Sequence, residues 1–240
     1  MKLSLSNLLS KLTALVVLSG LSAGLAYLVY TRQESLQWQY QLREQFNGTQ
    51  PLVMTSGDPY IRALMRTITA SEANDVKPYN VIYGGKRIYN LDLHPNICVP
   101  IRWGPNRGLC STAAGRYQFL NTTWEEKAKL YHPEPKTTGF INRREVYSFE
   151  PEYQDFVMYS WLSDRKAWGF DITKKLQQNQ IEEVLCNLSQ TWTSLGCGIE
   201  DNSVTPKLVS IYHSVLGEEL AKMKIESPQI SMELSLRDNL

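Results

Sequence analysis

The sequence is short of the side chains that would direct it to nucleic acid or to a metal ion. Its 25 lysines and arginines nearly balance 24 aspartates and glutamates, which leaves a net charge of +1. A strong basic field of the kind that attracts nucleic acid is therefore excluded. Only three histidines occur, and no two of them have metal-ligand spacing. We predict no metal, no cofactor and no nucleic-acid partner.

Long hydrophobic runs are also scarce, and the longest uncharged run lies near the N-terminus and includes residues 13–30. As a helix it would span about 27 Å, just enough for a bilayer core. Lys2 and Lys11 precede it and favour a cytoplasmic N-terminus. The alternative is a cleaved signal peptide, because Gly24-Leu25-Ala26 resembles a cleavage site. The run continues past that site, so we expect a single-pass membrane anchor. Both alternatives export the rest of the chain.

The four cysteines all lie in the part expected to be exported. An even set in an oxidising compartment favours disulfides over buried free thiols. Three pairings are possible, and we predict the local one, which joins Cys98 to Cys110 and Cys186 to Cys197. Each bond would close a short loop and contribute about 2–4 kcal/mol if unstrained.

Helical signals dominate the exported part. Asp58 and Pro59 have the residue types of a helix N-cap and first turn. Apolar residues follow at three- and four-residue spacing, which predicts an amphipathic helix to about Glu72. Residues 80–93, NVIYGGKRIYNLDL, contain two β-rich runs around Gly84-Gly85, a pattern typical of a hairpin with a two-residue turn.

After this hairpin the pattern is again mostly helical, so we predict an α+β fold that is mainly helical with one small antiparallel hairpin. The chain has 240 residues and is 42% hydrophobic, which is enough for one large domain. The expected divisions are a cytoplasmic N-terminus (1–12), the anchor (13–30), a juxtamembrane linker or helix (31–56), the folded domain (57–225) and a flexible tail (226–240).

Glu72 is the first candidate for acid catalysis. It falls at the expected C-terminal end of its helix, where the helix dipole disfavours an ionised carboxylate. Partial burial would act in the same direction. Both effects would keep it protonated near neutral pH, as a general acid requires. A glutamate at a helix end is more often a solvated surface residue, so its position alone does not establish the role.

The stretch STAAGRYQFL at residues 111–120 is the second candidate. Gly115 would let backbone and substrate approach closely. Tyr117 would offer a flat face to a sugar ring, and Gln118 supplies a donor and an acceptor for hydroxyl or acetamido groups. The competing interpretation makes Tyr117 a core residue.

Arg116, within the same stretch, has more than one possible role. It could contribute to a sugar site, or it could hold a buried carboxylate such as Glu72 or Asp75. The competing interpretation makes it a surface cation.

These pieces occur in the order in which they occur in a known family. Ser71-Glu72 ends the first helix, and the later pieces are YNVIYGG at 79–85, HP within 92–95, STAAGRYQFL at 111–120 with Trp124, and TWTSLG at 191–196. Over roughly residues 59–216 the chain resembles the lytic transglycosylases typified by bacteriophage lambda lysozyme, within the lysozyme-like superfamily.

The resemblance implies a lysozyme-like domain that cleaves peptidoglycan glycan strands, with Glu72 as the single catalytic residue. Glu72 would protonate the glycosidic oxygen after N-acetylmuramic acid. Its carboxylate would then accept the proton of the C6 hydroxyl of that sugar as this oxygen attacks C1, which leaves a 1,6-anhydro end. The implied substrate-binding residues are Ser71, Tyr79, Asn90, Gly115, Arg116, Tyr117 and Gln118.

Two departures from the family pattern leave alternatives open. Asn90 stands where relatives carry an acidic residue, and residues 196–202 lack the tyrosine that is expected to help organise the catalytic site. Asn202 is a candidate replacement. A hydrolytic muramidase would need a second acid, for which Asp75 and Asp92 are candidates. A wall-binding scaffold with impaired catalysis is the alternative outside the enzyme class.

Overall fold

The computed structural model describes residues 24, 27, 49–102, 104, 106–139, 143–200 and 202–237. The expected cytoplasmic segment and most of the anchor and linker, residues 1–48 apart from Gly24 and Tyr27, lie outside the described residues. Within the described part, no helix is both long and apolar enough to cross a bilayer. The anchor therefore stays a prediction.

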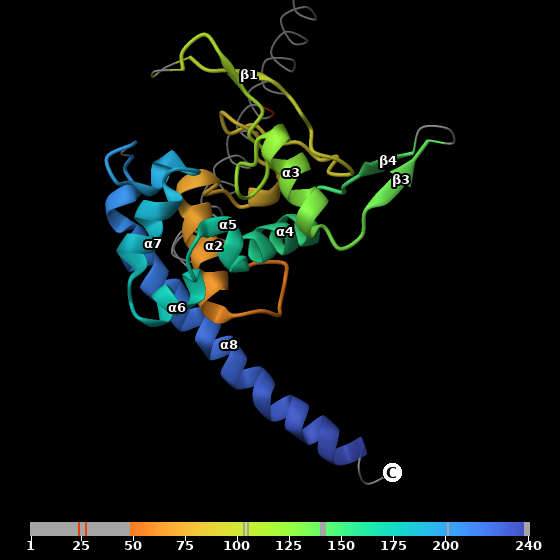
Figure 1. Ribbon diagram of the computed structural model, residues 1–240, viewed down its shortest axis with the longest axis vertical. Coiled ribbons are helices and arrows are strands. Elements are labelled where there is room, and N and C mark those ends of the chain that lie inside the picture. Colours follow the sequence, from red (N-terminus) through yellow and green to blue (C-terminus); the bar gives the residue numbers. More distant parts are fainter. Residues whose placement is uncertain are drawn as a thin grey trace, which may run out of the picture.

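The described chain is mainly helical with two small antiparallel sheets, which confirms the predicted α+β class (Figure 1). The α-helices are α2 (Pro59–Glu72), α3 (Asn121–Tyr131), α4 (Pro151–Ser163), α5 (Arg165–Trp168), α6 (Ile172–Gln177), α7 (Ile181–Leu188) and α8 (Leu208–Arg237). Short 3-10 turns are η1 (Pro78–Asn80), η2 (Thr193–Leu195) and η3 (Thr205–Lys207). The strand pairs are β1 (Val99–Pro100) with β2 (Cys110–Ser111), and β3 (Lys136–Thr138) with β4 (Arg144–Val146).

Helix α2 is the central element, and it begins as the sequence predicts. The Asp58 side chain accepts hydrogen bonds from the backbone amides of Tyr60 and Ile61, and so satisfies two of the free donors of the first turn. Most residues of α2 are buried, and α4, α6 and α8 pack around it. Its C-terminal end, at Glu72, is therefore held from several sides.

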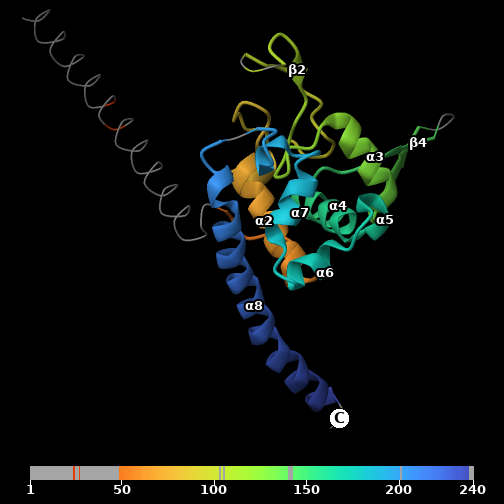
Figure 2. The same cartoon turned by 60° about the vertical axis from the view of Figure 1, so that its left-hand side comes forward.

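Helix α8 lies along α2 and is joined to it by a buried ion cluster (Figure 2). Glu219 accepts from Arg62 at 2.7 Å and from Arg66 at 2.8 Å, and its side chain is fully buried. Burial alone would raise the pKa of Glu219, but hydrogen bonds from Lys222, Arg66 and Arg62 lower it to about 2. Beyond this cluster α8 continues to Arg237, so the flexible tail predicted from residue 226 is helical as far as that residue.

The predicted hairpin is present, but it is shorter and its turn is larger than expected. The Ile82 amide donates to the Lys86 carbonyl at 2.8 Å, and Val81 forms an isolated bridge with Arg87. Tyr83, Gly84 and Gly85 lie between the paired residues, so the turn has three residues instead of the predicted two. Both glycines have φ of +81°, a region that favours residues without a Cβ.

The stretch at 111–120 folds back against this hairpin. Ala114 bridges both Ile82 and Phe119, and the Gly115 amide donates to the Val81 carbonyl at 2.7 Å. Residues 115–118 form the turn between the two sides, with Gly115 at φ +74° and Gln118 at φ +48°. The glycine therefore serves a tight, buried turn, and it places Gln118 next to the hairpin.

Two parts of the fold differ from the sequence prediction. The β3–β4 hairpin lies in a region predicted to continue helically, and its strand residues are mostly exposed and polar. The predicted linker 31–56 is wrong for its described end, because Leu52 is buried and the amides of Val53 and Met54 donate to the Asp155 carboxylate at 2.9 and 3.1 Å. The folded domain thus includes residues 49–56.

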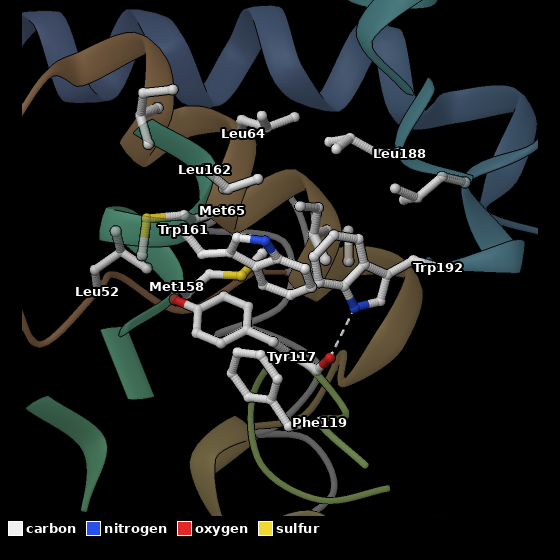
Figure 3. Close-up of a cluster of buried hydrophobic side chains, with 14 of the residues drawn as sticks. Leu52, Leu64, Met65, Tyr117, Phe119, Met158, Trp161, Leu162, Leu188 and Trp192 are labelled. Atoms are coloured by element: carbon white, nitrogen blue, oxygen red, sulfur yellow. Dashed lines mark hydrogen bonds between the residues drawn. The ribbon is translucent and has the colours of Figure 1, made fainter. Parts of the chain in front are cut away.

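An aromatic layer joins the turn at 115–118 to the helices (Figure 3). Tyr117, Phe119, Trp161 and Trp192 pack together with Met158, and the Trp192 indole donates to the Tyr117 carbonyl at 2.9 Å. Trp161 lies 5.3 Å from Trp192 between ring centroids. Because residue 192 directly precedes η2, this layer fixes η2 relative to the turn.

The disulfides pair locally, as predicted. Cys98 is bonded to Cys110 and Cys186 to Cys197. The first bond ties the loop before β1 to β2, and the second ties α7 to the segment that follows η2. Both therefore brace loops near the turn and the end of α2.

Gly115→Ala tests the close approach in this turn. A Cβ on Gly115 would lie 2.2 Å from Gln154 Oε1 and 2.7 Å from Phe149 Cζ. A Cβ on Gly85 would meet nothing within 4 Å, although its φ is also positive. We expect Gly85→Ala to cost about 1–2 kcal/mol, and Gly115→Ala to cost about 2–3 kcal/mol more through the clash. Chemical denaturation of both variants measures the difference, and equal losses would contradict this packing.

Candidate active site

Glu72 lies in a groove of about 520 Å³ at the C-terminal end of α2. We call this the Glu72 groove. Its walls come from the end of α2, the hairpin around Gly84, the stretch at 111–120 and the segment around η2. Side chains from these four segments include Ser71, Glu72, Asp75, Tyr83, Gln118, Leu120, Thr191, Trp192, Thr193, Ser194, Glu200 and Asn202. The segments are distant in the sequence, and all four include pieces singled out above.

The Glu72 carboxyl group is half-buried, and it is bound by the hydroxyl of Ser194 on η2, which donates to Oε1. Burial raises the pKa of Glu72, the Ser194 hydrogen bond lowers it, and repulsion from Glu200 raises it, with a result of about 7. Burial is the largest of these effects, because removal from water disfavours the charged form. Near neutral pH the group is therefore present in both its acid and its base form.

Hydrogen bonds hold η2 against the end of α2. Ser71 donates to the Ser194 carbonyl at 3.1 Å, and Thr205 donates to the same carbonyl at 2.9 Å. Asn202 in turn donates to the Ser71 hydroxyl at 3.2 Å. Ser71, predicted as a substrate-binding residue, thus positions the residue that contacts Glu72. Asn202 reaches the same cluster, from the segment in which the family tyrosine is absent.

The candidate second acids are separated by the structure. Asp75 lines the Glu72 groove, where Arg87 of the hairpin binds both its oxygens at 2.9 and 2.8 Å. Asp92 and Asn90 instead are exposed residues of a separate cavity of about 560 Å³. The structure therefore does not bring Asn90 or Asp92 into the Glu72 groove, and their predicted roles stay predictions.

Three predicted sugar-binding residues are buried away from the groove. Tyr117 and Arg116 are fully buried, and Tyr79 is 7% exposed. The hydroxyls of Tyr79 and Tyr117 donate to the Asp155 carboxylate at 2.7 and 2.5 Å. Tyr117 is thus a core residue with no free face for a sugar.

Arg116 is neither a surface cation nor a partner of Glu72 or Asp75. Its guanidinium donates to Thr69 Oγ1 at 2.8 Å, to the Pro51 carbonyl at 2.9 Å and to the Tyr79 hydroxyl at 3.2 Å. Arg116 therefore holds α2 and residues 50–51 in place from inside the domain.

Gly115 and Gln118 have different placements. Gly115 is buried beneath Gln154 and does not line the groove. Gln118 does line it, and its Nε2 donates to the carbonyls of Val81 and Gly115 at 3.2 and 2.9 Å. These bonds orient the amide and hold a backbone with positive φ.

Sequence reasoning missed several residues of the groove, most importantly Ser194, Glu200 and Tyr83. Ser194 lies inside the TWTSLG piece, so its position in that motif was the available signal. Glu200 is exposed, and its carboxylate accepts from Thr193 Oγ1 at 2.8 Å. No local pattern marks it. Among the described residues, no cluster of three or more histidine, cysteine, aspartate or glutamate side chains could hold a metal ion.

The chain belongs to the endolysin family, whose sequence model matches residues 62–218. It is 26% identical over 117 residues to the endolysin of Escherichia phage lambda. The aligned part covers 49% of this chain and 60% of that protein, which is less than two thirds of the relative's length. The predicted family resemblance is confirmed.

Two solved structures of bacteriophage lambda lysozyme are also similar. One, complexed with a chitohexasaccharide, has a TM-score of 0.49 and 23% identity, and covers 68% of this chain and 97% of the solved one. The other has a TM-score of 0.44 and 19% identity, and covers 70% and 97%.

The raised pKa of Glu72 has a consequence for stability. A carboxyl group that binds its proton more tightly in the folded state favours folding at low pH, and this contribution is lost as pH rises from about 4.5 to about 7. Glu72→Gln removes the ionisation. We therefore expect the variant to exceed the parent in free energy of unfolding by about 1–3 kcal/mol at pH 8 and by little at pH 4.

Urea denaturation at the two pH values measures this difference. Glu182→Gln, on the exposed face of α7, is the matched control for loss of one carboxylate. A gain from Glu72→Gln that is the same at both pH values would show that burial does not hold the Glu72 proton.

Proposed function

We propose that the protein degrades peptidoglycan, with Glu72 as the general acid. The observation that carries this proposal is the half-buried Glu72 carboxyl with a pKa of about 7, set in a groove at the end of α2. A pKa near the working pH lets one group donate a proton and later accept one. Membership of the endolysin family, and a similar lambda lysozyme complexed with a chitohexasaccharide, support a glycan in this groove.

The finer proposal is a lytic transglycosylase that cleaves the bond between N-acetylmuramic acid and N-acetylglucosamine. Glu72 protonates the leaving glycosidic oxygen, and the resulting carboxylate takes the proton from the C6 hydroxyl of the N-acetylmuramic acid. That oxygen attacks C1, so the bond to the leaving sugar breaks and a 1,6-anhydro ring closes without consumption of water. Ser194 stabilises the Glu72 carboxylate that forms after the first proton transfer, because its hydroxyl donates to that carboxylate.

A hydrolytic muramidase is the second candidate, and Glu200 is the observation that favours it. Glu200 is a second carboxylate in the Glu72 groove, and Thr193 holds it next to the residue that contacts Glu72. A second carboxylate could activate water on the other side of the sugar. Asp75 is less suited to this task, because Arg87 occupies both of its oxygens.

We further propose that residues 13–30 anchor the chain in a bacterial inner membrane, with the folded domain in the periplasm. The supporting features are the uncharged run, the two lysines that precede it, and the two disulfides, which form in oxidising compartments. Cleavage of the run as a signal peptide would release the same domain outside the membrane.

Product analysis with the full-length protein tests the reaction. We expect purified sacculi to release muropeptides with 1,6-anhydro ends, detected by mass spectrometry as products lighter by one water than reducing ends. Glu72→Gln should lower the rate by about 10³-fold or more, because the amide cannot donate the proton. Glu182→Gln is the control.

The alternative outcomes of this assay are distinct. Reducing ends from the parent protein would reject cyclisation and support the muramidase. Binding to sacculi without any release of glycan, by parent and variant alike, would identify a scaffold instead of an enzyme.

Glu200→Gln separates the two catalytic schemes. In the cyclising scheme the variant keeps its anhydro products, and the high-pH limb of its activity profile moves to lower pH. This follows because burial, the Ser194 hydrogen bond and repulsion from Glu200 together set the pKa of Glu72, and the variant removes the last. In the hydrolytic scheme the variant loses activity at every pH, by about 10²-fold or more. Glu126→Gln, an exposed change on α3, is the matched control.

A further inference from the structure

A second groove, of about 780 Å³, is larger than the Glu72 groove and plays no part in the mechanism above. It lies between α3 and the β3–β4 hairpin, which stand side by side at one end of the domain (Figures 1 and 2). We call it the basic groove, because Lys129, Arg143 and Arg144 line it.

Consecutive residues at the start of α3 line the two grooves. Leu120 lines the Glu72 groove, and the next residue, Asn121, lines the basic groove. The Asn121 amide donates to Thr112 Oγ1 at 3.1 Å, and the neighbouring Ser111 again lines the Glu72 groove. The chain from Ser111 to Asn121 therefore connects the walls of the two grooves, and a substituent on a sugar beside Glu72 that followed it would reach the basic groove.

The cations of the basic groove are available to a ligand. Within the described part of the chain, none of the salt bridges involves Lys129, Arg143 or Arg144. All three are exposed. Two carboxylates, Glu125 and Glu145, line the same groove, and Glu145 accepts from the Tyr147 hydroxyl at 2.7 Å.

His94 adds no charge to this groove. It lies on the wall near the Glu72 groove, where its Nε2 contacts the Phe119 carbonyl at 2.8 Å and its Nδ1 accepts from the Asn96 amide at 3.1 Å. Burial lowers the pKa of this imidazole, which agrees with a neutral ring. The groove thus offers three cations and two anions to a ligand of mixed charge.

We propose that the basic groove binds the stem peptide of peptidoglycan, with Lys129, Arg143 and Arg144 against its free carboxylates. This inference rests on the proposed function, which places N-acetylmuramic acid at Glu72. That sugar carries the peptide on its lactyl ether, so the peptide leaves the glycan next to the cleaved bond. Arginine matches carboxylates through paired N–H donors, and lysine contributes a mobile point charge.

The carboxylates of the groove fit the same ligand. A stem peptide that contains a diamino acid carries a free amine besides its carboxylates, and Glu125 or Glu145 would pair with that amine. The site therefore favours a short peptide of mixed charge over a uniformly anionic polymer such as nucleic acid. The chain should therefore prefer glycan strands that carry stem peptides to bare glycan.

Kinetics on two substrates test the proposal with the full-length protein. One substrate is purified glycan strands with their stem peptides, and the other is the same strands after an amidase has removed the peptides. For the double variant Lys129→Gln/Arg144→Gln we expect KM on peptide-bearing strands to rise about fivefold to tenfold, with kcat unchanged and no change on stripped strands. The matched control is Lys166→Gln/Lys174→Gln, which removes two exposed cations from α5 and α6.

Failure of this inference is separable from failure of the proposed function. If the double variant matches the parent on both substrates, or loses equally on both, the stem-peptide site is rejected while catalysis stands. If the parent cleaves neither substrate, the proposed function fails, and titration of the free stem peptide still decides the site. In that titration, binding that persists in the double variant, or when the peptide carboxylates are amidated, overturns the assignment.

Discussion

The buried carboxylate of Asp155 is the interaction on which the arrangement of the domain depends. It is fully buried and accepts from the hydroxyls of Tyr79 and Tyr117 and from the amides of Val53 and Met54. These donors come from three places in the sequence, so one side chain of α4 joins residues 53–54, η1 and the turn at 115–118. A desolvated carboxylate without such donors would cost several kcal/mol, which makes the donors obligatory and fixes the segments that carry them.

The carboxyl group of Glu72 is in the opposite situation, because it accepts few hydrogen bonds. Asp155 accepts hydrogen bonds from four donors. Among the described residues, the Glu72 carboxyl accepts one, from Ser194. Burial therefore outweighs hydrogen bonding at Glu72, and its pKa rises to about 7. The two groups are connected, because the turn held by Asp155 presents the Tyr117 carbonyl to Trp192, and the chain continues from there to Ser194. The carboxylate of Asp155 thus helps to place Ser194, which donates to Glu72.

Features set by contacts between residues close in the sequence were predicted, and features set by long-range contacts were not. The start of α2, the position of the Gly-Gly turn and both disulfide pairings involve residues close in the sequence, and they were predicted. The roles of Arg116 and Tyr117 were not, because their polarity said nothing about Asp155, which lies 38 residues beyond Tyr117. The order of the motif pieces along the chain identified the right segments. The family roles carried over to these pieces, however, assigned buried framework residues to the substrate. Glu200 and the β3–β4 hairpin escaped notice because both are polar and exposed, so no hydrophobic period marked them.

The segment that lacks the family tyrosine is held in place by a disulfide and a side-chain hydrogen bond. Cys197 lies two residues after the end of η2 and is bonded to Cys186 of α7, and Asn202 binds Ser71 at the end of α2. The segment is therefore fixed at both ends, once covalently and once to the helix that carries Glu72. On the far side of α2, Glu219 holds Arg62 and Arg66. Glu72 projects from a helix restrained on both sides, so the geometry of the Ser194 contact does not depend on an aromatic side chain in the groove. The segment after η2 is thus held to α7 and to the end of α2 without an aromatic side chain of its own.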